Sequence, residues 1–448
     1  MKVITNAYII TMDSEHHIYP HGSIVVENKR IKDISEKNDL LEQYPNAEEI
    51  DAKGMLVLPG LINAHTHIFQ ILYKGLGDDA ALTDWLWKCV YPLSIHLTAE
   101  DSFDAARLTA LEMVRGGCTT VVDSHYANID LGCQDAIASA VEETGIRGVL
   151  GRAAIDNAPA PELMRESVPQ AVSEAERVID TYNGAAEGRL SVRIEALNEK
   201  LASQELLLAM RDVSLRKHIG MNMHIAEVAA RTRELQEARG MTSIEYAQSL
   251  GIAGEDVLLA HCCWLSDHDI DLIAQTGTHV AHNPVSNQYL ADGVAPIPKM
   301  IAKGINVAAG PDGACSNNNQ NMFDVMKSAA LLHKVHNLDP VSMTAEQALA
   351  MVTINAAKAI GKESDLGSIE KGKLADLIIV DQFSPGMTPC FDPISNLVYA
   401  ATPEIVQTVM IDGKIVMKNR DLKTMDHQLI INRANNAAYR LARKAGVL

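Results

Sequence analysis

The chain has 448 residues, of which 47% are hydrophobic and 21% are charged, and its formal net charge at pH 7 is −18. This balance is typical of a globular protein and excludes disorder along the whole chain. An acidic surface repels nucleic-acid phosphates and anionic membranes, so we expect neither as a partner.

The seven cysteines predict reduced thiols. They are scattered without a CxxC motif, and the adjacent pair Cys262-Cys263 is poorly placed to form a bridge. The first residues contain no long apolar core and no cleavage signal, and no stretch approaches the roughly 18 apolar residues of a membrane span. We therefore expect a cytoplasmic protein.

Both ends of the chain are predicted to form β-structure. Short strand-like segments make up residues 1–57. Similar segments make up the stretch from 367 to 417, where Asp412-Gly413 indicates a hairpin. Chain termini often lie close together, so we predict one composite β-sandwich from residues 1–57 and 361–448. The last residues of that region are predicted to form a helix that is basic at its end.

The middle of the chain, residues 58–360, alternates apolar strand-like runs with amphipathic helical segments. There are eight such runs: LPGLINAH, CTTVVDSH, RGVLGRAA, LSVRIEA, IGMNMHIAE, DVLLAHC, THVAHNP and INVAAGPD. This alternation predicts an α/β fold, a parallel TIM (β/α)8 barrel. A doubly wound open sheet is the alternative, but no GxGxxG follows the first run, which disfavours its dinucleotide-binding form.

Metal-competent side chains stand at the ends of five of the eight predicted strands. In chain order they are His65 and His67, His224 with Glu227, His261, His282, and Asp312. A single histidine at a strand end is more often a satisfied polar group. Because catalytic groups of a TIM barrel lie at the carboxyl ends of its strands, the joint pattern predicts a functional site there.

The predicted metal ligands are three imidazoles and one carboxylate. They are His65, His67, His224 and Asp312. Such a set suits one Zn²⁺ or Fe²⁺ ion with a position left for water, whose pKa the ion lowers towards neutrality. Glu227 could then take a proton from water and pass it to a leaving nitrogen, and His261 could hydrogen-bond the attacking oxygen.

The chain resembles the amidohydrolase superfamily, in its mononuclear deaminase branch, over essentially its whole length. The motifs that carry the resemblance are PGLINAHTH at 59–67, HIAE at 224–227, LLAHC at 258–262, AHNPVSN at 281–287, GPDGACSNNN at 310–319 and the tail GSIEKGKLADLIIVD. The resemblance implies a TIM barrel with a composite β-sandwich and metal-assisted hydrolytic deamination. It implies the same four metal ligands, with Glu227, His261 and Asp312 as catalytic residues.

Within that branch the chain is similar to triazine- and purine-type deaminases and chlorohydrolases. The similarity implies release of ammonia from an amino-substituted nitrogen heterocycle: a guanine-like purine, a pterin, a pyrimidine or an aminotriazine. The alternatives are hydrolysis of C–Cl or C–NHR bonds on s-triazines and deamination of adenosine or S-adenosylhomocysteine. A cyclic-amide hydrolase and a catalytically silent metal-binding relative are further alternatives. The expected partners are a small heterocyclic substrate and further copies of the chain in a homo-oligomer.

The sequence departs from the family pattern at three points. Adenosine-type relatives usually carry a histidine after strand four, where this chain has Leu197, which favours compact bases over adenosine-like substrates. The usual threonine before the metal-binding aspartate is Pro311. Binuclear relatives use a modified lysine at the end of strand four, but this strand ends in Glu195-Ala196, so one ion is expected.

Substrate-binding residues are weakly encoded, and each candidate has a plain structural alternative. Gln70 could bond a ring nitrogen or be a solvated loop amide, and Trp85 could stack on a heterocycle or pack into a helix. Arg152 could meet a carbonyl or carboxylate or form a salt bridge across the barrel rim. The predicted set is Gln70, Trp85, Arg152, Glu195 and His282.

Overall fold

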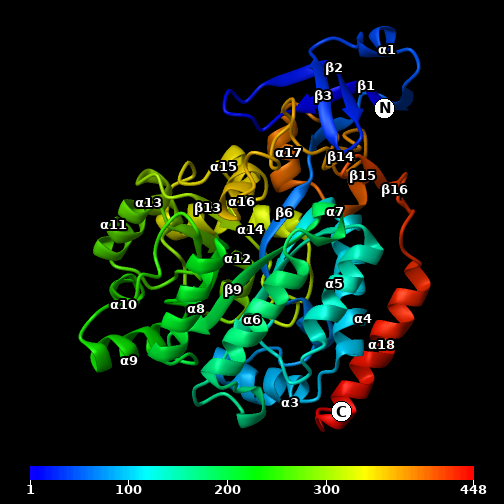
Figure 1. The fold of residues 1–448 in the computed structure, drawn as a ribbon. Helices are drawn as coiled ribbons and strands as arrows, with labels where there is room; N and C mark the ends of the chain where they lie inside the picture. Colours follow the sequence, from blue (N-terminus) through cyan, green and yellow to red (C-terminus); the bar gives the residue numbers. More distant parts are fainter.

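The computed structural model describes residues 1–448, which form an eight-stranded parallel sheet and a separate nine-stranded mixed sheet (Figure 1). The strands of the parallel sheet are β6 (Leu61–Thr66), β7 (Cys118–Asp123), β8 (Arg147–Ala154), β9 (Leu190–Asn198), β10 (Met221–Ile225), β11 (Val257–His261), β12 (His279–His282) and β13 (Val307–Ala309). Each coincides with one of the eight predicted runs, although β6 and β9 continue one and two residues past theirs, and the hydrogen-bonded order is sequential from β6 to β13. The predicted barrel is confirmed.

The first and last strands of this sheet meet through one backbone contact. The amide of Asp312 donates to the carbonyl of His65 at 3.2 Å, just beyond the end of β13. Gly310 makes this approach possible, because a Cβ atom there would lie 2.5 Å from the same carbonyl oxygen. Barrel closure therefore places the loop with Asp312 directly against the strand end with His65 and His67.

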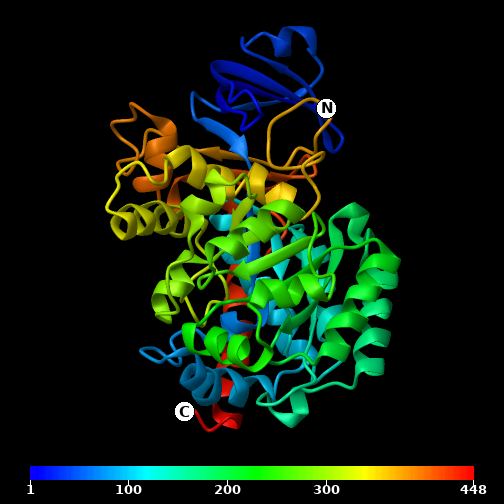
Figure 2. The same cartoon turned by 90° about the vertical axis from the view of Figure 1, so that its left-hand side faces the viewer.

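Helices surround the barrel on its outer face (Figure 2). The longer ones are α4 (Ala99–Arg115), α5 (Cys133–Thr144), α6 (Val168–Tyr182), α8 (Gln204–Lys217), α9 (Ala229–Arg239), α11 (Asp267–Thr276) and α14 (Met322–Asn337). The shorter ones are α7 (Ala185–Gly188), α10 (Ser243–Ser249), α12 (Pro284–Tyr289), α13 (Ile297–Ala302), α15 (Ala345–Met351), α16 (Ile354–Ala359) and the 3₁₀ turn η3 (Glu162–Met164). Reciprocal capping boxes begin α4, α10, α11 and α15.

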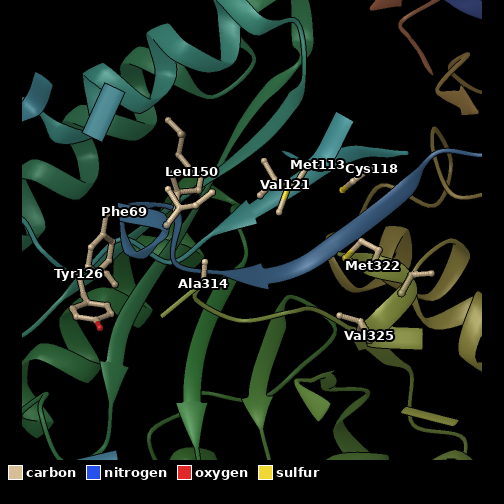
Figure 3. Packing of buried hydrophobic residues seen from close by; sticks show 14 of the residues in the cluster. Phe69, Met113, Cys118, Val121, Tyr126, Leu150, Ala314, Met322 and Val325 are labelled. Carbon is tan, nitrogen blue, oxygen red and sulfur yellow. The ribbon is translucent and has the colours of Figure 1, made fainter. Parts of the chain in front are cut away.

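One irregular connection replaces the usual short loop between β6 and its helix α4. It contains η1 (Ile68–Tyr73), α2 (Leu82–Trp85), the π-helical turn η2 (Leu86–Val90) and α3 (Tyr91–Ser94). Phe69 in this connection packs edge-on against Tyr126 at 5.1 Å between ring centres, inside the buried cluster of Figure 3. The connection is thus anchored in the core at its start, beside the carboxyl end of β6.

The second sheet combines both ends of the chain. Its strands are β1 (Lys2–Ile10), β2 (Ile18–Glu27), β3 (Arg30–Ser35), β4 (Glu48–Asp51), β5 (Leu56–Pro59), β14 (Leu377–Val380), β15 (Val406–Ile411), β16 (Lys414–Lys418) and β17 (Asp421–Leu422). The antiparallel pair β5–β14 joins the two halves. β15 and β16 form the hairpin that Asp412-Gly413 predicts, with φ of 50° and 69° at these two residues.

The remaining elements complete the two chain ends. They are α1 (Leu40–Gln43), α17 (Pro393–Tyr399), η4 (Pro403–Ile405) and α18 (His427–Lys444). The terminal helix α18 runs along the outside of the barrel beside α4 (Figure 1), where Arg433 Nε lies 2.8 Å from Asp104 Oδ1. No helix combines the length and apolar character that crossing a bilayer requires.

A buried ion cluster joins the barrel to the mixed sheet. Arg147, the first residue of β8, donates Nε and Nη2 to the two carboxylate oxygens of Asp376 at 2.9 and 3.1 Å. Its Nη2 also bonds Asp412 in the β15–β16 hairpin. All three side chains are buried. The mixed sheet therefore contacts the amino end of the barrel strand β8.

Replacing Arg147 by methionine is expected to destabilise the protein strongly. The Arg147→Met change keeps most of the side-chain volume but leaves the buried Asp376 without a cation and Asp412 with only the partly exposed Lys29, whose Nζ lies 3.4 Å from Oδ2. Breaking such a buried pair costs about 3–5 kcal/mol. The midpoint of urea unfolding should fall accordingly. Arg177→Met is the matched control, because Arg177 pairs with Asp135 in a partly exposed position and such pairs contribute at most about 1 kcal/mol. Equal midpoints for the two variants would contradict this account of the domain junction.

Candidate active site

The four predicted metal ligands converge at the carboxyl ends of β6, β10 and β13. The Nε2 atoms of His67 and His224 lie 3.2 Å apart. Asp312 Oδ1 lies 3.4 Å from His65 Nε2 and 3.3 Å from His67 Nε2. All four side chains are buried. Donor atoms about 2.1 Å from a tetrahedral ion lie roughly 3.4 Å from one another, so these spacings fit one divalent ion.

Hydrogen bonds on the far side of each ligand fix its orientation. His67 Nδ1 donates to the carbonyl of Ser124 at 2.6 Å, and His224 Nδ1 lies 2.7 Å from Glu195 Oε1. Asp312 Oδ2 accepts from the hydroxyls of Ser286 and Ser316, which turns Oδ1 toward the imidazoles. His65 Nε2 and Asp312 Oδ1 are buried without a hydrogen-bond partner. The unpaired donor atoms therefore face one common point, as metal ligands do.

Burial and mutual contact shift the pKa values of the ligand side chains. Burial lowers the pKa of His67 to about 3, so its imidazole is neutral at pH 7. Burial opposes ionisation of Asp312, but the facing imidazoles hold the pKa of its carboxyl well below the usual range. Burial opposes protonation of His224, but the Glu195 carboxylate outweighs it and raises the pKa of His224 to about 9, so this ring must give up a proton when it binds an ion. Three imidazole nitrogens and one carboxylate oxygen form a donor set that suits Zn²⁺ or Fe²⁺.

Backbone strain accumulates at the same strand ends. His261 and Asp312 adopt left-handed conformations with φ of 71° and 66°, and Ala226 has φ of 48°. Such conformations are costly for residues with a Cβ atom and are concentrated at functional sites. They turn the side chains that follow β10, β11 and β13 inward over the barrel mouth.

Glu227 and His261 stand beside the ligand cluster. Glu227 Oε1 lies 3.7 Å from His261 Nε2, and Glu227 Oε2 lies 3.5 Å from Arg231 Nη1. His261 Nδ1 donates to Asn287 Oδ1 at 2.9 Å, so in the neutral ring the Nε2 lone pair faces the cluster. A carboxylate and an imidazole in this position can both exchange protons with a bound water or substrate.

A cleft with about 480 Å³ of free space, part of it open to solvent, lies above these residues. Its floor is polar and its wall is largely apolar. The lining consists of His67, Gln70, Leu82, Trp85, Leu86, Tyr91, Tyr126, Leu197, Asn198, Leu201, His224, Glu227, Arg231, His261, Leu290 and Asp312. The irregular connection after β6 supplies much of the wall. Apolar wall residues with a few polar groups among them are typical of a small-molecule binding site.

Two of the five predicted substrate-binding residues line this cavity. Gln70 is buried and donates Nε2 to the Tyr126 hydroxyl at 2.8 Å, while its Oε1 has no hydrogen-bond partner. Trp85 is buried and donates its indole N–H to the carbonyl of Cys315 at 3.2 Å, so the ring forms a fixed part of the wall. Its neighbour Trp87 is 49% exposed and lies outside the cavity lining.

The structure does not bring the other three, Arg152, Glu195 and His282, into the cavity. The guanidinium of Arg152 forms a buried ion pair with Glu166 in the connection before α6. Glu195 lies behind His224 as its hydrogen-bond partner. The imidazole of His282 bonds His333 on α14, with 3.1 Å between their Nε2 atoms. In each case the buried charged or polar group bonds a protein partner and does not line the cavity.

Sequence reasoning missed several wall residues. Tyr126 lies three residues beyond the end of β7, a position on the functional face that the strand pattern could have indicated. Arg231 lies four residues after Glu227, in the first turn of α9, within reach of the Glu227 carboxylate. Leu86 and Tyr91 come from the irregular connection, where no period marks which side chains face inward.

The purified protein is expected to hold one tightly bound divalent ion per chain, and Glu195→Gln should weaken its affinity about 10- to 100-fold. The change keeps the shape of the side chain but removes the charge that polarises His224. His65→Ala should abolish tight binding, since three ligands remain. Elemental analysis and competition with a chelator measure both effects.

Glu199→Gln is the control for this experiment. Glu199 is also buried just after β9, but its carboxylate bonds the hydroxyl of Ser243 rather than a ligand. Its replacement should leave metal affinity unchanged. Two tightly held ions per chain, or equal affinities for the Glu195 and Glu199 variants, would refute the assigned site.

Comparison with known proteins extends these observations to the whole chain. The model of the amidohydrolase family matches residues 56–416. The 5′-deoxyadenosine deaminase of Methanosarcina acetivorans is 39% identical over 445 residues, which cover 99% of both chains. The 5-methylthioadenosine/S-adenosylhomocysteine deaminase of Syntrophomonas wolfei is 36% identical over 443 residues, again 99% of both chains.

A solved structure has the same fold over nearly the whole chain. The crystal structure of an adenosine deaminase from Xanthomonas campestris with bound zinc superposes with a TM-score of 0.93 at 26% identity, covering 99% of this chain and 98% of the other. The family match spans the barrel and its ligand residues, and the superposition spans both sheets. The chain therefore belongs to the amidohydrolase family.

Proposed function

We propose that the protein is a metal-dependent hydrolytic deaminase of 6-aminopurine nucleosides, which replaces the amino group by an oxo group and releases ammonia. The observation that carries the proposal is the Glu227 carboxylate beside the four converging ligands described above, in one cavity at the barrel mouth. The full-length similarity to 5′-deoxyadenosine deaminases supports the choice of substrate.

Leu197, in place of the histidine of adenosine-type relatives, favours compact bases. The relatives instead favour the adenosine-type alternative, and the next residue offers a polar contact. Asn198 lines the cavity, and its Oδ1 accepts the backbone amides of Lys200 and Leu201 at 3.0 and 2.9 Å. Its Nδ2 group is therefore left as a donor. We assign it to a ring nitrogen of the purine.

A second cavity of about 630 Å³ supports a preference for an apolar 5′ end. It shares Leu82, Leu86, Tyr91, Leu201 and Arg231 with the catalytic cavity and adds mostly apolar groups, among them Pro159 and Val228. Its lysine, Lys200, is paired with Glu234 at 2.6 Å. Such a surface suits the methyl group of 5′-deoxyadenosine or a methylthio group better than a charged amino-acid tail.

The metal site supplies one part of the chemistry. A divalent ion held by the four ligands would lower the pKa of a water molecule and so provide a nucleophile at neutral pH. The donor atoms fit this ion, as their spacings and the unpaired Nε2 of His65 indicate.

The proton movements are assigned to side chains of this protein. Water adds its oxygen to the ring carbon that carries the amino group, and Glu227 takes a proton from this water and places it on the adjacent ring nitrogen. His261 and Asp312 hold the adding oxygen in position. Glu227 then takes the remaining proton of the added oxygen and passes it to the amine, because an unprotonated amine is a poor leaving group, and the oxygen becomes the oxo group of the product. The carbon–nitrogen bond breaks and ammonia departs.

Ammonia release from a panel of substrates tests the proposed specificity. Metal-loaded protein should act on 5′-deoxyadenosine and 5′-methylthioadenosine with kcat/KM at least about tenfold above S-adenosylhomocysteine, because loss of one good apolar or ionic contact costs about 1–3 kcal/mol. Guanine, a pterin, a pyrimidine and an aminotriazine complete the panel. Preferential turnover of any of these compact bases would contradict the nucleoside assignment. It would favour the compact-base substrate that Leu197 indicates.

Glu227→Gln is expected to lower kcat about 10²- to 10⁴-fold while metal content and unfolding temperature stay unchanged. The amide is nearly isosteric with the carboxylate but cannot shuttle a proton. Glu237→Gln is the control, since Glu237 is an exposed carboxylate on α9, the helix that follows Glu227, and lines neither cavity. Near-normal kcat in the Glu227 variant would remove this residue from the mechanism.

A further inference from the structure

A second group of potential metal ligands lies beside the first. One donor atom from each of Glu227, His261 and Asp292 lies within 4.8 Å of the other two. Glu227 and His261 follow β10 and β11, and Asp292 follows α12 after the next strand, β12. The group is therefore built from three neighbouring strand ends of the barrel. Asp292 has no part in the proposed deamination.

The main chain holds Asp292 in place. Its amide donates to the carbonyl of Asn287 at 2.9 Å, and its carbonyl accepts the indole N–H of Trp264 at 2.6 Å. Gly293 follows with φ of 137°, and a Cβ atom there would lie 2.9 Å from the Trp264 ring nitrogen. The backbone thus fixes the carboxylate without using its oxygens.

The Asp292 carboxylate is buried and incompletely paired. The residue is 2% exposed, and its Oδ2 has no hydrogen-bond partner. No lysine or arginine forms an ion pair with it, because the nearby Arg231 is directed at Glu227. Burial and the negative charges of Glu227 and Asp312 raise the pKa of Asp292 to about 9. A buried acid in this environment requires either a proton or a cation.

The third member supplies a nitrogen donor. His261 Nδ1 is engaged by Asn287, so Nε2 is the ring nitrogen left to bind an ion, and it lies 3.7 Å from Glu227 Oε1. This separation is close to the roughly 3.4 Å expected between two ligands of one tetrahedral zinc ion. One imidazole and two carboxylates form a donor set that zinc accepts.

We propose that Glu227, His261 and Asp292 form a second, weaker Zn²⁺ site, and that its occupation inhibits the enzyme by engaging Glu227. The site is weaker than the first because it offers three protein ligands rather than four and stands next to another divalent charge. The inhibitory part rests on the proposed deaminase function. The binding part does not, since it concerns only the three side chains.

Zinc binding to the one-ion holoenzyme tests the site directly. In equilibrium dialysis against increasing Zn²⁺, the wild-type protein should take up a second equivalent that is removed again by dialysis. Asp292→Asn should bind this second ion at least tenfold more weakly and retain the first. In deaminase assays, the zinc concentration that halves the rate should rise by the same factor.

Asp267→Asn is the matched control, because Asp267 is an exposed aspartate at the start of α11 that pairs with Lys299. It should bind the second ion as the wild type does. The proposal is overturned if the wild type takes up no second ion in millimolar Zn²⁺, or if Asp292→Asn takes it up with unchanged affinity. Should Asp292→Asn fail to fold, Glu227→Gln must show the same loss in dialysis. Absence of turnover on every nucleoside would refute the proposed function but leave the dialysis result decisive for the site.

Discussion

Facing lone pairs within a buried cluster repel one another, and the candidate site holds four such ligand groups from three strand ends at the mouth of the barrel. Their arrangement depends on bonds made behind them. Ser124 fixes His67, Glu195 fixes His224, and Ser286 with Ser316 fixes Asp312. Barrel closure at Gly310 brings the first and last of these strand ends together. The ligand geometry is therefore a property of the whole parallel sheet and its outer hydrogen bonds.

The same arrangement assigns metal binding and proton transfer to different side chains. Glu227 stands outside the four-ligand cluster, where Arg231 and His261 lie on two sides of its carboxylate. Apolar side chains from the irregular connection after β6 cover the cavity and limit its access to water. A proton-transfer group in such a partly enclosed space acts on substrate rather than on bulk solvent, which is the condition for expelling a poor leaving group.

The barrel, and the strand ends at which the candidate ligands lie together, could be predicted from sequence because both follow simple periods. Eight apolar runs define the strands, and polar residues at their ends mark the functional face. The direction of each strand-end side chain could not be predicted. Three residues have the same sequence context as the residues that line the cavity but point elsewhere: Arg152, Glu195 and His282. Each is held instead by a protein partner, which is Glu166, His224 and His333 in turn. Those partners lie far away in sequence or on other elements, so no local pattern reveals them.

The central claim is that water displaces an exocyclic amino group from an intact ring. Turnover of 5′-deoxyadenosine in ¹⁸O-labelled water, followed by mass spectrometry, tests this claim most directly. The account predicts a product with one labelled oxygen on the ring carbon that lost nitrogen, and one ammonia released for each label incorporated. A ring-opened product that keeps its amino group, or ammonia release without label in the product, would contradict it.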